Sequence, residues 1–125
     1  MNDPEAVVQR QLDAYNARDI QALMATYAAD AQIFEHPSKL VGSGAAALRE
    51  RFAARFKESN LHAHLRNRIV MGNTVVDHEL VTRTFPEGTG TLECVMIYEI
   101  QNGRIARAWS IAGAKLLDMR IQEPV

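Results

Sequence analysis

The tripeptide Glu35-His36-Pro37 places an acid–base side chain where a strand is expected to stop. Residues 31–34 alternate in a pattern that predicts a strand, and Pro37 ends it because proline has no backbone N–H to donate. A histidine side chain titrates at about pH 6.5, which suits proton abstraction near neutral pH. His36 is therefore the candidate acid–base residue if this strand end lies at the mouth of a pocket. A histidine in a surface turn gives the same pattern, and the sequence leaves both interpretations open.

Two further histidines and the single cysteine carry weaker signals. His62 and His64 share one face of a strand, but no third ligand follows at a suitable spacing, so we expect exposed sheet residues and no metal site. Cys94 has no cationic partner or helix start predicted beside it, which indicates a small buried residue and not a nucleophile. The motifs GxGxxG, GxxxxGK[ST], GxSxG and CxxC do not occur, so the sequence favours chemistry without a cofactor.

The run 75-VVDHELVTR-83 has the alternation of a strand, which divides its residues between two faces. One face carries Asp77, Glu79, Val81 and Arg83, and the other carries Val76, His78, Leu80 and Thr82. Hydrophobicity alone directs the second set inward, which leaves Glu79 for a salt bridge on the outer face, with Arg66 or Arg68 as a partner. The residues by themselves do not decide which face lines a pocket.

Composition and charge limit the class of protein. The chain has 125 residues, of which 47% are hydrophobic, so we expect one domain over residues 1–125. Its 14 basic and 15 acidic residues give a net charge of -1, which provides no drive toward nucleic acid or an anionic membrane. The N-terminus lacks a signal pattern, no apolar run reaches membrane-spanning length, and one cysteine cannot form an intrachain disulfide. These features predict a cytoplasmic protein.

Three helices are predicted in the first half of the chain. Asp3-Pro4-Glu5 starts the first, and Asp19 is the expected N-cap of the second. A third is expected over residues 45–57, with its charged residues on a solvated face. The apolar stripes are Val7, Val8, Leu12 and Tyr15 on the first helix, then Ile20, Leu23, Met24 and Tyr27 on the second; the solvated residues are Arg49, Glu50, Arg51 and Arg55.

The second half of the chain has the pattern of a sheet. Strands are predicted over residues 61–71, 74–85, 91–100 and 104–112, separated by short turns rich in glycine, asparagine and proline. Consecutive strands joined in this way form an antiparallel meander, so the fold class is α+β with the helices on one face of the sheet. The tail, residues 113–125, is expected to pack on a partner.

The order of elements resembles the nuclear transport factor 2-like superfamily, and within it the branch of ketosteroid isomerases and SnoaL-like polyketide cyclases. The resemblance covers nearly the whole chain and is carried by 22-ALMATYAADAQIFEHP-37, 42-GSGAAALRERF-52 and 98-YEIQNGRIARAW-109. It implies a cone-shaped α+β fold in which three N-terminal helices pack on a strongly curved, mostly antiparallel sheet that encloses a deep apolar pocket. Members often dimerise through the outer face of the sheet.

The resemblance also implies which residues surround the pocket. His36-Pro37 stands where the isomerases carry Asp-Pro with their general base, while Gln11 and Met96 stand at the two oxyanion donors. Gln11 can still donate through its amide but Met96 cannot, so true ketosteroid isomerisation is not expected. The same alignment turns Glu79 inward. The expected substrate contacts are Gln11, Tyr15, Glu79, Met96, Tyr98 and Trp109.

Two functions from different classes follow. The first is a cofactor-independent isomerase, cyclase or lyase acting on a small apolar carbonyl compound, and it predicts an inward-facing, pH-sensitive His36. The second is a non-catalytic module that binds a small apolar molecule or serves dimerisation, and it predicts a blocked pocket and a stable dimer. In both, the expected partners are a small apolar molecule and a second copy of the chain, with no nucleic acid or membrane.

Overall fold

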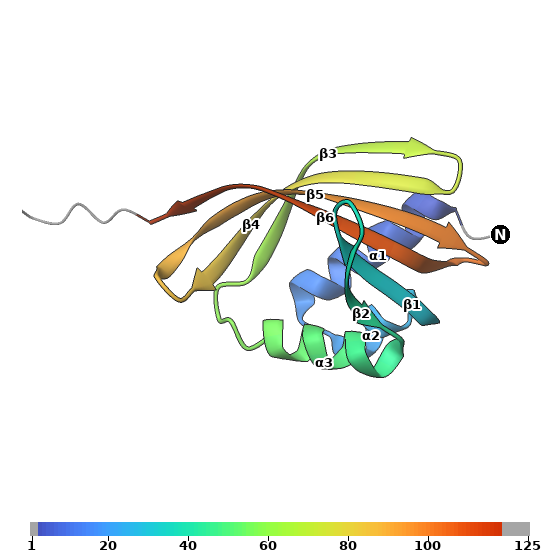
Figure 1. Cartoon of the computed structure of the whole chain (residues 1–125), viewed down its shortest axis with the longest axis horizontal. Helices are drawn as coiled ribbons and strands as arrows, with labels where there is room; N and C mark the ends of the chain where they lie inside the picture. The colour runs from blue at the N-terminus through green and yellow to red at the C-terminus, as the bar shows by residue number, and fades with distance from the viewer. Residues whose placement is uncertain (1–2, 119–125) are drawn as a thin grey trace, which may run out of the picture.

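The computed structural model describes residues 3–118 as three helices and one six-stranded sheet (Figure 1). The fold is the expected α+β cone, in which the sheet curls without closing and the helices lie on its concave side. The helices are α1 (Pro4–Ala17), α2 (Ile20–Met24) and α3 (Ala45–Arg55). The strands are β1 (Tyr27–Glu35), β2 (Lys39–Ser43), β3 (His62–Met71), β4 (Thr74–Phe85), β5 (Gly88–Gln101) and β6 (Arg104–Leu117).

The first two helices begin at the residues that the sequence predicts. The Asp3 side chain accepts a hydrogen bond from the Glu5 backbone N–H at 3.1 Å, and Pro4 occupies the first helical position. Asp19 caps α2 in the same way through the backbone N–H of Ala22 at 3.1 Å. Arg18 ends α1 in the left-handed conformation, with φ of 54°. These local signals turn the chain sharply and hold α2 beside α1.

The sheet order is β2-β1-β6-β5-β4-β3. The predicted meander is confirmed, because β3, β4, β5 and β6 are successive antiparallel neighbours. The only parallel pairing between described strands joins β1 to β6. Both strands of the β5–β6 hairpin are longer than expected, so residues 113–117 of the tail extend β6. The rest of the predicted tail extension, residues 119–125, lies outside the described residues.

Two expectations about the middle of the chain are wrong. Tyr27 does not extend the second helix; α2 ends at Met24, and Tyr27 opens β1, where it pairs with Ile105 of β6. The spacing of its apolar residues fits a helix, but pairing with a distant strand overrides that local preference. Residues 39–43 form β2 at the edge of the sheet, where the sequence indicated only a flexible turn at 42–44.

The core lies between the helices and the concave face of the sheet. Val7, Val8 and Leu23 from the helices and Ile105 from β6 are completely buried there. Burying each of these side chains contributes roughly 1.5–3 kcal/mol, which holds the helices against the sheet. Within residues 3–118, no helix is long and apolar enough to cross a membrane. The apolar core ends part of the way along the cone, and a cavity occupies the remaining space.

Candidate functional site

A cavity of about 240 Å³ lies between the helices and the concave face of the sheet. A cavity of this volume can admit a small organic molecule. Apolar side chains form most of the lining surface, and polar and charged side chains form the rest. The polar lining residues are Gln11, Tyr15, Tyr27, Glu79, Tyr98 and Ser110, and the charged residues at the rim are Glu35, Arg51, Arg55 and Arg83.

Strand β4 turns its carboxylates toward the inside of the cone. Glu79 pairs with Cys94 on β5, and both side chains are buried and line the cavity. His78 lies on the opposite face, where its Nε2 atom is 2.7 Å from the Glu93 carboxylate. Glu79 therefore faces inward, as the resemblance implied, and the arrangement that hydrophobicity alone favours is wrong. The inward face can hold a carboxylate because it meets a cavity at this position.

Glu79 is the titratable group at the centre of the cavity lining. Its pKa is raised to about 7, mainly because the almost fully buried side chain is desolvated. The charge of Asp77 contributes to this rise, while the charge of Arg68 opposes it. Asp77 is completely buried and accepts two hydrogen bonds from Arg68, at 2.7 and 2.9 Å. Glu79 can therefore take and release a proton near neutral pH without any metal.

Three phenols, those of Tyr15, Tyr27 and Tyr98, line the cavity together with this carboxyl group. Gln11 links two of them: its Nε2 donates to the Tyr27 hydroxyl, and its Oε1 accepts from the Tyr98 hydroxyl, both at 3.4 Å. Burial raises the pKa of Tyr27 and Tyr98, and the nearby charge of Glu79 raises it further. Burial also raises the pKa of Tyr15, although Arg55 opposes the shift. Tyr27 keeps its own hydroxyl proton, so it can donate to an oxygen atom in the cavity.

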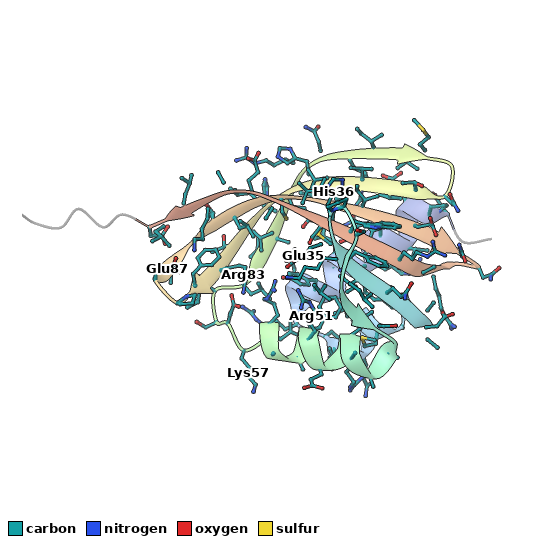
Figure 2. All side chains as sticks on the ribbon, viewed as in Figure 1. Glu35, His36, Arg51, Lys57, Arg83 and Glu87 are labelled. Atoms are coloured by element: carbon teal, nitrogen blue, oxygen red, sulfur yellow. The ribbon has the colours of Figure 1, made fainter. Side chains whose placement is uncertain are left out.

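Arginines from two elements form the rim of the cavity. Arg51 and Arg55 come from α3 and Arg83 comes from β4. Figure 2 shows Arg51 and Arg83 in the space between that helix and the sheet. Glu58 holds Arg83 through two bonds, at 2.6 and 3.2 Å, and lies 3.7 Å from Arg55. Arg51 is exposed, as expected for a solvated face, and Arg55 is partly buried; both also line the cavity, which the sequence did not predict.

His36 and Trp109 do not line the cavity. His36 is exposed in the turn after β1, where its backbone N–H donates to the Ser110 carbonyl at 2.8 Å (Figure 2). Glu35, the last residue of β1, occupies the rim position instead. Ser110 faces the cavity, so its neighbour Trp109 faces outward, where it stacks on Phe34 with ring centroids 5.7 Å apart. The expected inward orientation of His36 is therefore not observed.

The other predicted contacts come together in one place. Gln11, Tyr15, Glu79, Met96 and Tyr98 all line the cavity, from α1, β4 and β5. Cys94 lies among them, and burial raises the pKa of its thiol to about 12, which keeps it protonated. Among residues 3–118, no group of three His, Cys, Asp or Glu side chains is arranged to hold a metal ion. The site is thus a buried acid–base group with hydrogen-bond donors around it.

Comparison with known proteins agrees with this architecture. Residues 8–108 match the SnoaL-like domain, and the chain belongs to that family. No curated protein matches the sequence.

Solved structures show the same fold. A cystatin fold protein from Novosphingobium aromaticivorans has a TM-score of 0.80 at 24% identity, with 89% of this chain and 98% of that one covered. An NTF2-like protein of unknown function from Cytophaga hutchinsonii has a TM-score of 0.74 at 12% identity, covering 90% and 92%. A proposed polyketide cyclase from Sinorhizobium meliloti has a TM-score of 0.68 at 28% identity, covering 83% and 92%. The resemblance seen in the sequence is confirmed at the level of family and fold.

Proposed function

We propose that the cavity catalyses proton transfer on a small carbonyl compound, as a cofactor-independent isomerase or cyclase, with Glu79 as the acid–base group in place of His36. The observation that carries this proposal is the buried Glu79 carboxyl group, which faces a cavity and has a pKa raised to about 7. A group that titrates near the operating pH is the most effective general base. The similarity to a proposed polyketide cyclase supports the same class of substrate.

The proposed reaction needs only groups that line the cavity. The Glu79 carboxylate removes a proton from the carbon next to a carbonyl group, and the electron pair of the C–H bond moves onto the carbonyl oxygen. Tyr27 donates a hydrogen bond to that oxygen as its negative charge develops. Protonated Glu79 then returns the proton to another carbon of a conjugated enolate. In a cyclisation, the enolate carbon instead attacks a second carbonyl carbon of the same molecule, and Glu79 gives its proton to the alkoxide that forms. The raised pKa of Tyr27 keeps its hydroxyl proton in place for this role.

The lining of the cavity narrows the choice of reaction. Met96, an apolar residue, lines the cavity at the position that the resemblance assigns to an oxyanion donor. Because a thioether cannot donate a hydrogen bond to an oxyanion, this residue supports the expectation that the protein is not a ketosteroid isomerase.

Solvent deuterium exchange tests the proposal without knowledge of the natural substrate. Small cyclic ketones are incubated with the protein in D2O, and deuterium at the α-carbon is measured by mass spectrometry. We expect catalysed exchange that increases as pH rises through about 7, because Glu79 must be ionised. Glu79→Gln should lower the rate at least about 100-fold, the usual scale of general-base catalysis. His36→Ala and the exposed control Glu50→Gln should keep the wild-type rate. Exchange that survives in Glu79→Gln but disappears in His36→Ala would reject this assignment.

The second candidate is a non-catalytic module that binds a small molecule or forms a dimer. It is supported by Met96 in place of a donor and by apolar side chains exposed on the sheet. Ile69 and Ile111 are 60% and 38% exposed, and their neighbours Val76 and Val95 on β4 and β5 share the outer face. We propose a homodimer through this face. Sedimentation velocity of the wild type and Ile111→Lys tests it: a monomeric wild type would exclude the dimer.

A further inference from the structure

Positive charge exceeds negative charge at the mouth of the cavity. Arg51, Arg55 and Arg83 supply three guanidinium groups, and Glu58 is the carboxylate that contacts two of them. Glu35 also lines the cavity, but Lys39 lies 3.5 Å from it and offsets its charge. The three guanidinium groups and the single Glu58 carboxylate therefore leave a surplus of two positive charges at the mouth. The chain as a whole has a net charge of -1, so this surplus is local.

The arginines are not equally occupied by contacts within the protein. Arg83 donates through Nε and Nη2 to Glu58, which fixes its position on β4. Arg55 lies 3.7 Å from Glu58 and is near enough to Tyr15 for its charge to oppose the rise in the pKa of that phenol. Among residues 3–118, no ion pair joins Arg51 to an acidic side chain. Arg51 and Arg55 are four residues apart on α3 and so lie on the same side of that helix, facing the cavity.

Glu79 and the rim residue Arg83 lie on one face of β4, with Glu79 in the middle of the strand and Arg83 near its end. Glu79 and Arg83 are separated by four residues on this strand, which places their Cα atoms roughly 13 Å apart at about 3.3 Å per residue. Val81 lies between them and lines the cavity as an apolar wall. The cavity thus offers a proton-transfer group inside, an apolar middle and a cationic entrance.

From this arrangement we propose that the substrate is a small cyclic carbonyl compound that carries a carboxylate. The ring lies along the apolar wall, the carbonyl group meets Glu79 and Tyr27, and the carboxylate binds Arg51 and Arg55 at the entrance. Guanidinium groups recognise carboxylates with two parallel hydrogen bonds, which fixes orientation as well as charge. This inference rests on the proposed function, because the carbonyl end is assigned from the role of Glu79.

A matched pair of ligands tests the charge requirement. The probes are 4-oxocyclohexanecarboxylate and its methyl ester, which share the ring and the ketone but differ in charge. Titration calorimetry at low salt should show the carboxylate binding at least tenfold more tightly than the ester. Arg51→Gln and Arg55→Gln should each reduce that preference severalfold, with unchanged far-UV circular dichroism. Arg49→Gln is the control, because Arg49 is exposed on α3 and does not line the cavity; it should keep the preference. Equal binding of the two probes, tighter binding of the ester, or no binding of either overturns the proposal.

Deuterium exchange on the same samples separates this inference from the proposed function. Selective binding of the carboxylate without catalysed exchange would support the anion site and reject proton transfer by Glu79. Catalysed exchange of both probes with equal affinity would support proton transfer and overturn the anion site. Arg51→Gln should raise KM for exchange of the carboxylate more than it lowers kcat, because Arg51 binds the end of the molecule that does not react.

Discussion

Replacing Glu79 with glutamine should change how the stability of the protein depends on pH. Burial and, to a smaller extent, the charge of Asp77 together raise the pKa of Glu79 from 4.5 to about 7 in the folded protein. Between these two values the folded chain holds a proton that the unfolded chain has released. The contribution of Glu79 to the free energy of unfolding is therefore complete below pH 4.5 and is lost as pH rises through about 7.

The size of this effect follows from the shift. The difference between 4.5 and about 7 is about 2.5 pKa units, which corresponds to about 3 kcal/mol at roughly 1.36 kcal/mol per unit. Solvent screens little of it, because the Glu79 side chain is only 5% exposed. Glutamine has nearly the same shape and does not ionise. The free energy of unfolding of Glu79→Gln should therefore rise by about 3 kcal/mol relative to that of the wild type between pH 4.5 and pH 8.

Urea unfolding followed by far-UV circular dichroism, at constant ionic strength from pH 4.5 to 8.5, measures this gain. The free energy of unfolding of the exposed control Glu50→Gln should depend on pH in the same way as that of the wild type over the whole range. A difference between Glu79→Gln and the wild type that does not change with pH would refute the reasoning. It would mean that Glu79 stays ionised in the folded protein and cannot serve as the proposed proton acceptor and donor.

Three other predictions concern groups around the cavity. Arg68→Gln should lower the free energy of unfolding by about 3–5 kcal/mol, because it leaves the completely buried Asp77 without its partner; a loss below about 1 kcal/mol in urea unfolding would contradict this. Cys94 should react with iodoacetamide about a thousandfold more slowly in the folded than in the unfolded chain at pH 8, because its pKa rises from 9.0 to about 12. Equal rates, measured by mass spectrometry, would show that the thiol is accessible and ionised. Trp109, the only tryptophan, stacks on Phe34 outside the cavity, so its fluorescence should not follow occupation of the cavity by a ligand; a change at saturating 4-oxocyclohexanecarboxylate would place it at the cavity wall.

The parts of the fold that local signals determine could be predicted from the sequence. Asp3 and Asp19 mark two helix starts with side chains that cap the backbone, and the turns between β3 and β6 contain glycine and asparagine at the bends. The assignment of Tyr27 failed because its spacing continues the α2 pattern, while the partner that makes it a strand residue is Ile105, far along the chain. β2 was missed because five residues with a glycine carry almost no strand signal.

The candidate site was predicted less well for a physical reason. Hydrophobic patterning assumes that inward-facing residues are apolar, but a cavity reverses this rule for Glu79 and for the arginines of α3. Family alignment found Glu79, Tyr15 and Tyr98 because it carries the position of the cavity, which patterning lacks. It also pointed to His36, although the chain turns away one residue earlier, after Glu35. A possible signal for Arg51 and Arg55 was their spacing of four residues, which places two like charges side by side on a helix.

The parallel pairing of β1 with β6 has a consequence for how the protein folds during its synthesis on the ribosome. Gln32 of β1 pairs with Arg107 of β6, so β1 has no such neighbour until the residues of β6 have left the exit tunnel. The helices and the β3–β5 meander can form earlier, because their contacts are local. Closing the long loop between β1 and β6 is entropically costly, which makes it a late step. The cavity wall at Ile33 and Ser110 is completed only then, and until that moment the inner face of the sheet is open to chaperones and to other nascent chains.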